Sequence, residues 1–330
     1  MTNNLDFLWY KLFQARGFGP KSIHIIYKTI RENGFSLEGV FNMVKSEFEN
    51  TFPELGKGRL KKANFDTLQR QNEEGVYEEY QRLKDNGVEI ISLDHKIYPK
   101  NVLKLMEDSA PPLLFCKGQL SLLKSEGIAI VGSRNASSEG VKIAKQFAAE
   151  LAMQGENVIS GYAKGIDTNA HLGALEEDGT TTIVLSFGIL EFSKKKIFED
   201  LRWKGNTLII SQFHPVEKWN ARNAMIRNKL ICALSKAVIV IESGEEKDKD
   251  GNMSGTFDAG KTALGMKIPL FVVSPSSFKN PPLGNKELIK CGGIEIESKD
   301  GIATLLKYVE MESTKGAELV ATEKQMSFFK

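Results

Sequence analysis

Two turns that combine glycine with a basic side chain lie close together between residues 128 and 175. The first is Gly132-Ser133-Arg134, directly after the apolar run at residues 128–131. The second is Gly161-Tyr162-Ala163-Lys164-Gly165, directly after the apolar pair at residues 158–159. A strand that turns on glycine into a helix presents backbone N–H donors, which suit an anionic ligand. Because Arg134 and Lys164 add positive charge, the pattern predicts a phosphate-binding face built from two adjacent loops.

The second turn continues into Asp167 and His171. Asp167 is well placed to cap the next helix, which is an alternative to a role in binding. His171 has no neighbouring cysteine or second histidine, so a structural hydrogen-bonding role is more common for such a residue than a role as ligand or base. Both residues are counted in the predicted binding site because they belong to the same motif.

Two further segments complete the predicted site. Arg227-Asn228 lies in a helical segment with half-apolar surroundings, where an ordinary basic solvent face is the alternative. Gly255-Thr256 opens another helix and supplies a third set of N–H donors. All these segments are expected at the carboxyl ends of parallel strands, so we predict that they converge on one anion. The predicted DNA- or phosphate-binding residues are Gly132, Ser133, Arg134, Gly161, Lys164, Gly165, Asp167, His171, Arg227, Asn228, Gly255 and Thr256.

Several motifs of catalysis and cofactor binding are missing from the sequence. It contains no G-x-x-x-x-G-K-[ST] loop, no serine nucleophile elbow and no Cys/His cluster with metal-ligand spacing. The G-x-G-x-x-G spacing of a dinucleotide site is absent as well. The sequence therefore favours binding over catalysis, with no catalytic residue, no cofactor and no metal expected.

The elements that must position these residues follow from the apolar pattern. Short apolar runs typical of buried parallel strands alternate with helical segments from residue 127 on. We predict an α/β fold, a Rossmann-like open and mostly parallel sheet with helices on both faces, preceded by a small helical domain of helix-hairpin-helix or SAM-like type. The predicted domains are a helical N-terminal domain (1–84), a connector with edge elements (85–126), a Rossmann-like domain (127–310) and a C-terminal tail (311–330).

The N-terminal helices contain a second feature with two interpretations. Gly17-Phe18-Gly19-Pro20-Lys21 resembles the hairpin of a helix-hairpin-helix, whose amides hold a DNA phosphate, and it also fits a plain connection between helices. Lys57, Arg59, Lys61 and Lys62 form either a basic patch or a solvated face.

The composition is that of an ordinary globular protein. The 330 residues are 41% hydrophobic and 26% charged, and the net charge of +2 permits nucleic-acid binding only where basic residues cluster. The three cysteines are far apart and odd in number, which argues against a disulfide framework. No secretory signal and no apolar run long enough for a bilayer is evident, so a soluble, cytoplasmic protein without membrane contact is expected.

The motifs resemble those of the DprA/Smf family (DNA-processing protein A) over about residues 95–297. The resemblance rests on residues 130–134, 160–167 with Ala170-His171 and Gly173-Ala174-Leu175, and Arg227-Asn228 before residues 233–235. It implies a Rossmann-like protein that binds single-stranded DNA, loads the RecA recombinase during natural transformation (competence) and forms a homodimer. It also implies that Arg134 and Lys164 contact phosphates, while Gly132, Ser133, Gly161 and Gly165 shape the pocket.

The chain also departs from the family pattern. Lys229 stands where many members have a second arginine after Arg227-Asn228, and a charged loop precedes Gly255-Thr256. These differences, with no room for a C-terminal winged helix, indicate a divergent branch whose role in transformation is less secure than its binding of DNA or nucleotides.

Two alternatives of a different kind stay open. Met225-x-Arg227 and Gly255-Thr256 resemble the LOG nucleotide hydrolases, which suggests a nucleotide sensor or hydrolase in phage defence, but Ala259 stands where those enzymes place a catalytic glutamate. The C-terminal Gln325, Met326, Phe328 and Phe329 resemble a peptide that docks on the sliding clamp, with packing on the chain's own domain as the alternative.

Overall fold

The computed structural model describes residues 5–312 and 314 of the chain. These residues form two compact units that interleave along the sequence. Unit 1 comprises the residues up to 125 together with 184–194 and 208–233, and unit 2 comprises 126–183, 195–207 and the residues from 234 on. The domain boundaries expected from the sequence stay a prediction.

The strands of the described residues form one nine-stranded mixed sheet with the order β1-β2-β6-β5-β4-β3-β7-β8-β9. Neighbours from β5 through β4, β3, β7 and β8 to β9 pair in parallel, whereas β1–β2 and β2–β6 pair antiparallel. This confirms the predicted α/β fold with an open, mostly parallel sheet. The strands are β1 (Glu89–Ser92), β2 (Leu113–Gly118), β3 (Gly127–Val131), β4 (Val158–Ser160), β5 (Thr181–Val184), β6 (Thr207–Ser211), β7 (Ser235–Val240), β8 (Leu270–Val273) and β9 (Ile294–Ile296).

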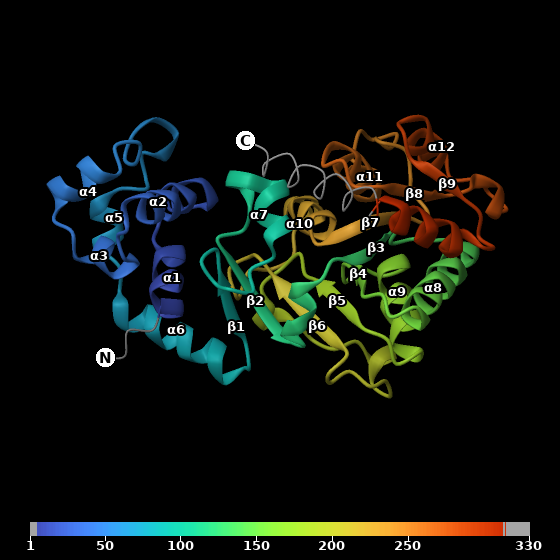
Figure 1. The fold of residues 1–330 in the computed structure, drawn as a ribbon, viewed down its shortest axis with the longest axis horizontal. Helices are drawn as coiled ribbons and strands as arrows, with labels where there is room; N and C mark the ends of the chain where they lie inside the picture. The colour runs from blue at the N-terminus through green and yellow to red at the C-terminus, as the bar shows by residue number, and fades with distance from the viewer. Residues whose placement is uncertain (1–4, 313, 315–330) are drawn as a thin grey trace, which may run out of the picture. The chain divides into compact units, whose positions relative to one another are not determined.

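Unit 2 packs its helices on the parallel strands, which are apolar and buried along their length. Helix α8 (Ser138–Met153) lies beside α9 (Ile166–Glu176), as Figure 1 shows. Their contact is close because Gly173 has no side chain, since a Cβ there would lie 2.1 Å from the Lys145 carbonyl oxygen. The remaining helices of this unit are α11 (Gly255–Gly265), α12 (Leu283–Lys290) and the helical residues 301–312.

The helix of residues 301–312 belongs to the core of unit 2. Ile302 and Leu305 are buried within the same apolar cluster as Phe147 and Phe271. The Tyr308 ring meets the Phe271 ring edge-on at 5.5 Å between centroids. Burial of each large apolar side chain stabilises the fold by about 1.5–3 kcal/mol.

Unit 1 combines the N-terminal helices with the antiparallel edge of the sheet. Helix α1 packs on β2, where the Phe115 ring meets Tyr10 at 6.1 Å and Phe13 at 5.5 Å between ring centroids. The helices of this unit are α1 (Leu5–Gln14), α2 (Pro20–Asn33), α3 (Leu37–Asn42), α4 (Lys45–Thr51), α5 (Phe65–Gln69), α6 (Glu73–Asp85), α7 (Lys100–Met106) and α10 (Ala221–Ala233). Short 3₁₀ turns in the two units span Gly58–Leu60, Glu107–Ser109, Leu120–Lys124, Ile189–Glu191, Lys196–Phe198 and Pro275–Ser277.

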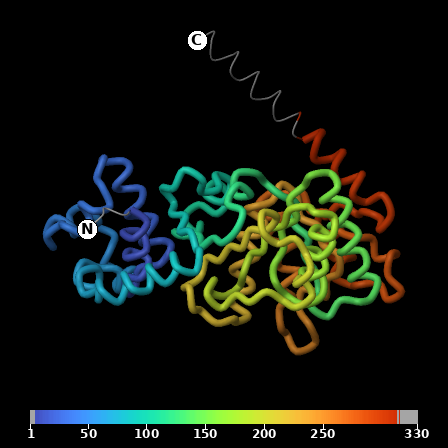
Figure 2. Tube along the Cα trace, turned by 90° about the horizontal axis from the view of Figure 1, so that it is seen from below, coloured from blue at the N-terminus to red at the C-terminus, as the bar shows by residue number. Residues whose placement is uncertain are grey.

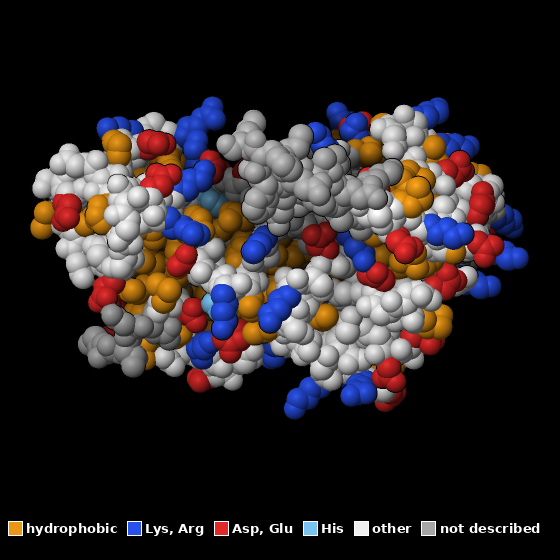
Figure 3. All heavy atoms as spheres, in the orientation of Figure 1, with side chains coloured by type: hydrophobic (Ala, Val, Ile, Leu, Met, Phe, Trp, Pro, Cys, Tyr) orange, Lys and Arg blue, Asp and Glu red, His pale blue; other side chains and the backbone are white. Residues whose placement is uncertain are grey.

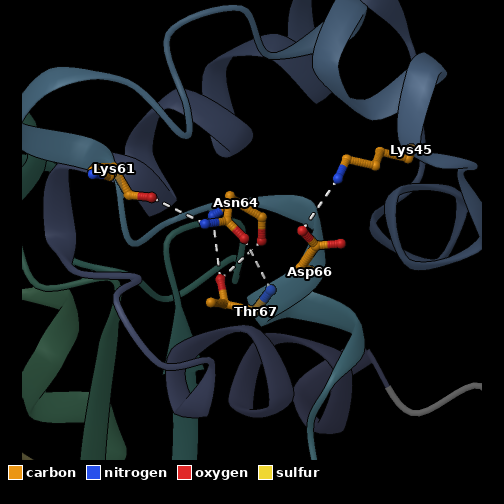
Figure 4. Close-up of polar contacts among 5 residues, drawn as sticks. All are labelled: Lys45, Lys61, Asn64, Asp66 and Thr67. Atoms are coloured by element: carbon orange, nitrogen blue, oxygen red, sulfur yellow. Dashed lines mark hydrogen bonds and ion pairs between the residues drawn. The ribbon is translucent and has the colours of Figure 1, made fainter.

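The five-residue helix α5 begins at a reciprocal cap (Figure 4). The Asn64 Oδ1 atom accepts from the Thr67 backbone N–H at 3.0 Å, and the Thr67 Oγ1 atom accepts from the Asn64 N–H at 3.2 Å. Lys45 adds an ion pair to Asp66 at 3.2 Å. Such a cap compensates for the low intrinsic stability of so short a helix.

A charged hairpin at residues 244–253 connects β7 to α11. Lys247 and Met253 form an antiparallel bridge, and the Asp248 Oδ1 atom accepts from the Asp250 N–H at 2.9 Å and the Asn252 N–H at 2.8 Å. Figure 2 shows this segment as the orange loop that projects from unit 2.

None of the helices in the described part of the chain is long and apolar enough to cross a membrane.

Candidate anion-binding site

The first two glycine turns meet in unit 2 through their backbones. Gly165 has a φ of +70°, which a side chain disfavours, and a Cβ there would lie 2.5 Å from the Ser133 oxygen and 2.8 Å from the Arg134 oxygen. The Ile166 N–H donates to the Ser133 oxygen at 3.3 Å. Gly132 is restricted by space alone, because a Cβ there would clash with the Ile166 side chain. Glycine at these positions therefore allows the two loops to touch.

Arg134 and Lys164 are both exposed on these touching loops. Each lies beside the backbone contact made by Gly165, so the two turns bring both cations to the same loop pair. On the face drawn in Figure 3, Lys and Arg side chains are interspersed with Asp and Glu. Because charges of both signs are mixed on this face, an anion binds where basic side chains lie close together and not because of the net charge of the protein.

Glu242, which sequence reasoning missed, joins the first turn to the loop after β7. Its backbone oxygen accepts from the Ser133 N–H at 2.8 Å, and its Oε2 atom accepts from the Ser137 N–H at 2.9 Å and the Ser137 hydroxyl at 2.7 Å. Ser137 in turn caps α8 by accepting from the Gly140 N–H at 3.0 Å. Its position after an apolar strand is also common for a solvated acid, so the sequence carried no signal that set Glu242 apart.

Asn285 joins the loop after β7 to the end of β8. This fully buried side chain accepts from the Ser243 N–H and donates to the Ile241 and Val273 oxygens, each at 2.8 Å. Helix α11 then begins at Gly255, which is exposed, with Thr256 half-buried behind it. Because β3 and β7 are parallel neighbours, the first turn and the loop after β7 leave the same edge of the sheet.

Asp167 does not cap the following helix as the sequence suggested. The cap position is Gly165, and the Asp167 Oδ2 atom accepts instead from the Ala163 N–H at 3.2 Å. Asp167 is buried, so its carboxylate closes the second turn back on itself. The expectation of a helix cap was wrong because the turn curls over the start of α9.

His171 is fully buried beneath the second turn. Its Nε2 atom lies 2.5 Å from the Gly161 oxygen, and its Nδ1 atom lies 2.6 Å from the Thr181 hydroxyl. Because a carbonyl oxygen only accepts, Nε2 carries the proton in this contact. His171 therefore acts as the structural hydrogen-bonding residue that was the alternative interpretation, and it anchors Gly161 to β5.

Lys195 is a second residue that sequence reasoning missed. Its ammonium donates to the Tyr162 oxygen at 3.0 Å, the Ala163 oxygen at 3.2 Å and the Thr168 hydroxyl at 2.8 Å. The same ammonium lies 4.2 Å from the centre of the Tyr162 ring. Burial lowers the pKa of Lys195. The residue lies in a run of lysines, so its sequence carried no signal that set it apart from solvated neighbours.

Arg227 and Asn228 lie on α10 in unit 1, whereas the glycine turns belong to unit 2. Both residues are buried, and the Arg227 Nη1 atom donates to the Val184 oxygen at 3.1 Å. The alternative of an ordinary basic solvent face is therefore wrong. The convergence of Arg227 with Arg134 and Lys164 on one anion stays a prediction.

Known proteins share these motifs and this fold. The family model described as DNA recombination-mediator protein A matches residues 89–307. DNA processing protein DprA of Streptococcus pneumoniae (strain ATCC BAA-255 / R6) is 38% identical over 151 residues, which is 44% of this chain and 51% of that relative. The chain thus spans about half the length of this curated relative.

Solved structures agree with the family match. The X-ray structure of DprA from Streptococcus pneumoniae covers 90% of this chain and 97% of its own, with a TM-score of 0.71 and 24% identity, and it confirms the fold. A structure that describes the single-stranded DNA binding mode of DNA processing protein A from Helicobacter pylori covers 67% of this chain and 96% of its own, with a TM-score of 0.54 and 26% identity. The family model covers most of the chain and includes all three glycine turns, so this protein belongs to the DNA recombination-mediator protein A family.

Proposed function

We propose that this protein binds single-stranded DNA through its phosphates and acts in DNA processing and recombination. The observation that carries the proposal is the direct contact between the first two glycine turns, which places the exposed Arg134 and Lys164 on one loop pair. The structure from Helicobacter pylori, which concerns single-stranded DNA binding, supports the same ligand. A cationic surface that follows a flexible backbone binds with little sequence preference.

The binding residues divide into contacts and supports in this proposal. Arg134 and Lys164 contact phosphates, and α9 adds backbone amides because its cap residue, Gly165, has no side chain to occupy them. Asp167 and His171 hold the loop from beneath, as their burial and hydrogen bonds indicate. Arg227 steadies the end of β5 through the Val184 oxygen. No step in this account requires catalysis.

The biological setting extends the proposal through family membership. We propose that the bound strand is handed to a RecA-type recombinase, as in natural transformation, by a cytoplasmic homodimer. Docking on the sliding clamp involves Gln325, Met326, Phe328 and Phe329, which lie outside the described residues, so it stays a prediction. Ala259 is buried in α11 where a LOG-type hydrolase needs a glutamate, so we do not propose hydrolysis.

Fluorescence anisotropy with a labelled single-stranded oligonucleotide tests the proposal. Arg134→Ala and Lys164→Ala should each weaken binding about tenfold, the size expected for loss of a charge-assisted hydrogen bond. Each should also lower the slope of log affinity against log salt by about 0.7, the value for one phosphate contact to a single strand. Lys142→Ala is the control, because it removes an exposed positive charge from α8 in the same unit, outside both glycine turns. Equal affinity and slope in all three variants would end the proposal.

A further inference from the structure

An open cavity of about 470 Å³ lies among the N-terminal helices of unit 1. It is formed by the residues at the end of α1, by α5 and by the start of α6, and it is separate from the glycine turns. Pockets of about 300–1,000 Å³ accommodate small-molecule ligands. The cavity is therefore large enough for a compact ligand, and none of the residues predicted for the anion site lines it.

The charge of the cavity wall favours an anion. Arg16 and Arg70 both line it and are exposed, and neither side chain has an ion pair or hydrogen bond within residues 5–312 and 314. Glu79 is the acidic lining residue, and its Oε2 atom accepts from the Tyr10 hydroxyl at 3.1 Å and from the Gln14 amide at 2.8 Å. Two arginines against one glutamate leave the wall with one net positive charge (2 − 1 = +1).

The rest of the wall is rich in carboxamides. Gln14, Gln71 and Asn72 all line the cavity. The Gln71 Nε2 atom donates to the Leu68 oxygen at 3.0 Å, while its buried Oε1 atom has no hydrogen-bond partner within the part of the chain that the structure describes. The Gln14 carboxamide donates to Glu79 and meets His214, and the Asn72 Oδ1 atom caps α6. Among the described lining carboxamides, the Gln71 Oε1 atom is therefore the acceptor that can meet a donor on the edge of a nucleobase.

The surface beside the cavity is basic. Gly17 has a φ of +89° and packs on residue 62, where a Cβ would lie 2.5 Å from the Lys62 oxygen. The Thr67 hydroxyl, which lines the cavity, donates to the same oxygen at 2.8 Å. Figure 4 shows Thr67 and Lys61 on this stretch of chain. The α1–α2 hairpin, residue 62 and α5 thus join, and this stretch carries the basic residues Lys57, Arg59, Lys61 and Lys62.

We propose that the cavity binds one nucleotide, with Arg16 and Arg70 on its phosphate and the Gln71 carboxamide beside its base. This inference rests on the proposed binding of single-stranded DNA, because the strand is the source of the nucleotide that we favour. A free mononucleotide carries the same phosphate and base. The basic stretch along residues 57–62 favours the strand, since further phosphates on either side of the bound nucleotide would meet it.

The test compares two double variants of the full-length protein. Arg16→Gln/Arg70→Gln removes the guanidiniums of the cavity, and Arg82→Gln/Lys104→Gln removes two positive charges of the same unit outside it. Affinity for a labelled oligothymidylate of about thirty nucleotides is measured over a range of salt. The cavity variant should lower the salt slope by about 0.7, the single-strand value for loss of one phosphate contact, while the control keeps the slope of the unmodified protein.

Photocrosslinking gives a second readout that does not depend on affinity. An oligonucleotide with 5-iododeoxyuridine should crosslink to peptides that contain residues 67–79, and the cavity variant should lose these crosslinks. Equilibrium dialysis with thymidine monophosphate distinguishes a free nucleotide from the strand. If only the cavity variant loses binding of thymidine monophosphate and its affinity for the oligonucleotide is unchanged, the ligand of the cavity is a free nucleotide. That result overturns the proposal, which names the strand.

The failure of this inference is distinguishable from that of the proposed function. If Arg134→Ala weakens strand binding and the cavity variant behaves as its control, without crosslinks at residues 67–79, the cavity inference alone is overturned. If Arg134→Ala and Lys164→Ala match Lys142→Ala while crosslinks at residues 67–79 persist, the function proposed for the glycine turns fails and the cavity inference stands.

Discussion

Gly165 carries two constraints at once. Its φ of +70° strains any residue with a side chain, and its missing Cβ leaves room for the carbonyl oxygens of Ser133 and Arg134. The second constraint is the functional one, because it sets how closely the two cationic turns approach. To separate the effect of backbone strain from the effect of the contact between the turns, a control glycine is needed that has a positive φ and no neighbouring atoms.

Gly165→Ala should therefore weaken binding of single-stranded DNA by more than its backbone strain explains. The backbone conformation of Gly165, with a φ of +70° and a ψ of −123°, costs a residue with a side chain about 1–3 kcal/mol. The new Cβ would also push Ser133 and Arg134 away from the turn. Urea unfolding measures the stability, and anisotropy with a labelled oligonucleotide measures the affinity.

Gly155→Ala is the matched control, because Gly155 has a φ of +76° and a Cβ added there would have no atom within 4 Å. It should lose stability through strain and retain its affinity. Equal affinity in the two variants would show that the contact between the turns does not shape the site.

Single residues also mark the limit of what sequence reasoning predicts here. Arg134 and Lys164 were identifiable because glycine turns after apolar strands have a known geometry. Lys195 and Glu242 were not, because their roles depend on hydrogen bonds to residues 27 or more positions away along the chain. A lysine within a lysine run and an acid after a strand look the same whether they hold a loop or face solvent.

At the scale of elements, the hairpin of residues 244–253 is an exposed segment that leads into the predicted binding site. Most of its residues are exposed, and it leads into the third glycine turn at Gly255. Glu245, Glu246, Asp248 and Asp250 against Lys247 and Lys249 give it a net charge of −2 (2 − 4). A negative hairpin next to a phosphate-binding edge should weaken the attraction of DNA.

Neutralising the hairpin's acids should strengthen DNA binding without affecting the fold. Glu245→Gln/Glu246→Gln should raise affinity about two- to fivefold at low salt, because like charge near the strand is removed, and the gain should fade as salt screens it. Lys247→Gln/Lys249→Gln is the control of opposite sign and should lower affinity. Thermal unfolding should give the same midpoint for both, since the side chains are exposed. Changes of the same sign in the two double variants would refute an electrostatic effect.

The elements themselves were largely predictable where the apolar pattern was strong. The runs at residues 128–131, 208–210 and 270–273 lie in β3, β6 and β8, because strands buried along their whole length require continuous apolar side chains. The antiparallel pairing of β2 with β6 was not predictable, since these strands are far apart in the sequence and the pattern of each says nothing of its partner. The packing of α1 on β2 is equally long-range, because the other N-terminal helices lie between these two elements in the sequence.

At the scale of the whole molecule, the reactivity of the cysteine thiols measures the opening of each unit separately. Cys116 on β2 and Cys232 on α10 are buried in unit 1, whereas Cys291 is exposed at the end of α12 in unit 2. Burial raises the pKa of the Cys116 thiol, so the reactive thiolate is suppressed there by both access and ionisation. The Cys116 and Cys232 thiols therefore react only when unit 1 opens.

Native protein should react at one thiol with 5,5′-dithiobis(2-nitrobenzoate) and at all three in denaturant. Cys291→Ser should abolish the fast phase, which identifies its source. The slow phase should become slower with excess oligonucleotide if DNA binds the native form of unit 1, because a ligand that binds only the folded state lowers the opening equilibrium constant by a factor of one plus the ratio of the free ligand concentration to its Kd. Fast reaction of a second thiol would contradict the burial of Cys116 and Cys232. An unchanged slow phase, with DNA bound at the glycine turns, would confine binding to unit 2 and count against the nucleotide cavity.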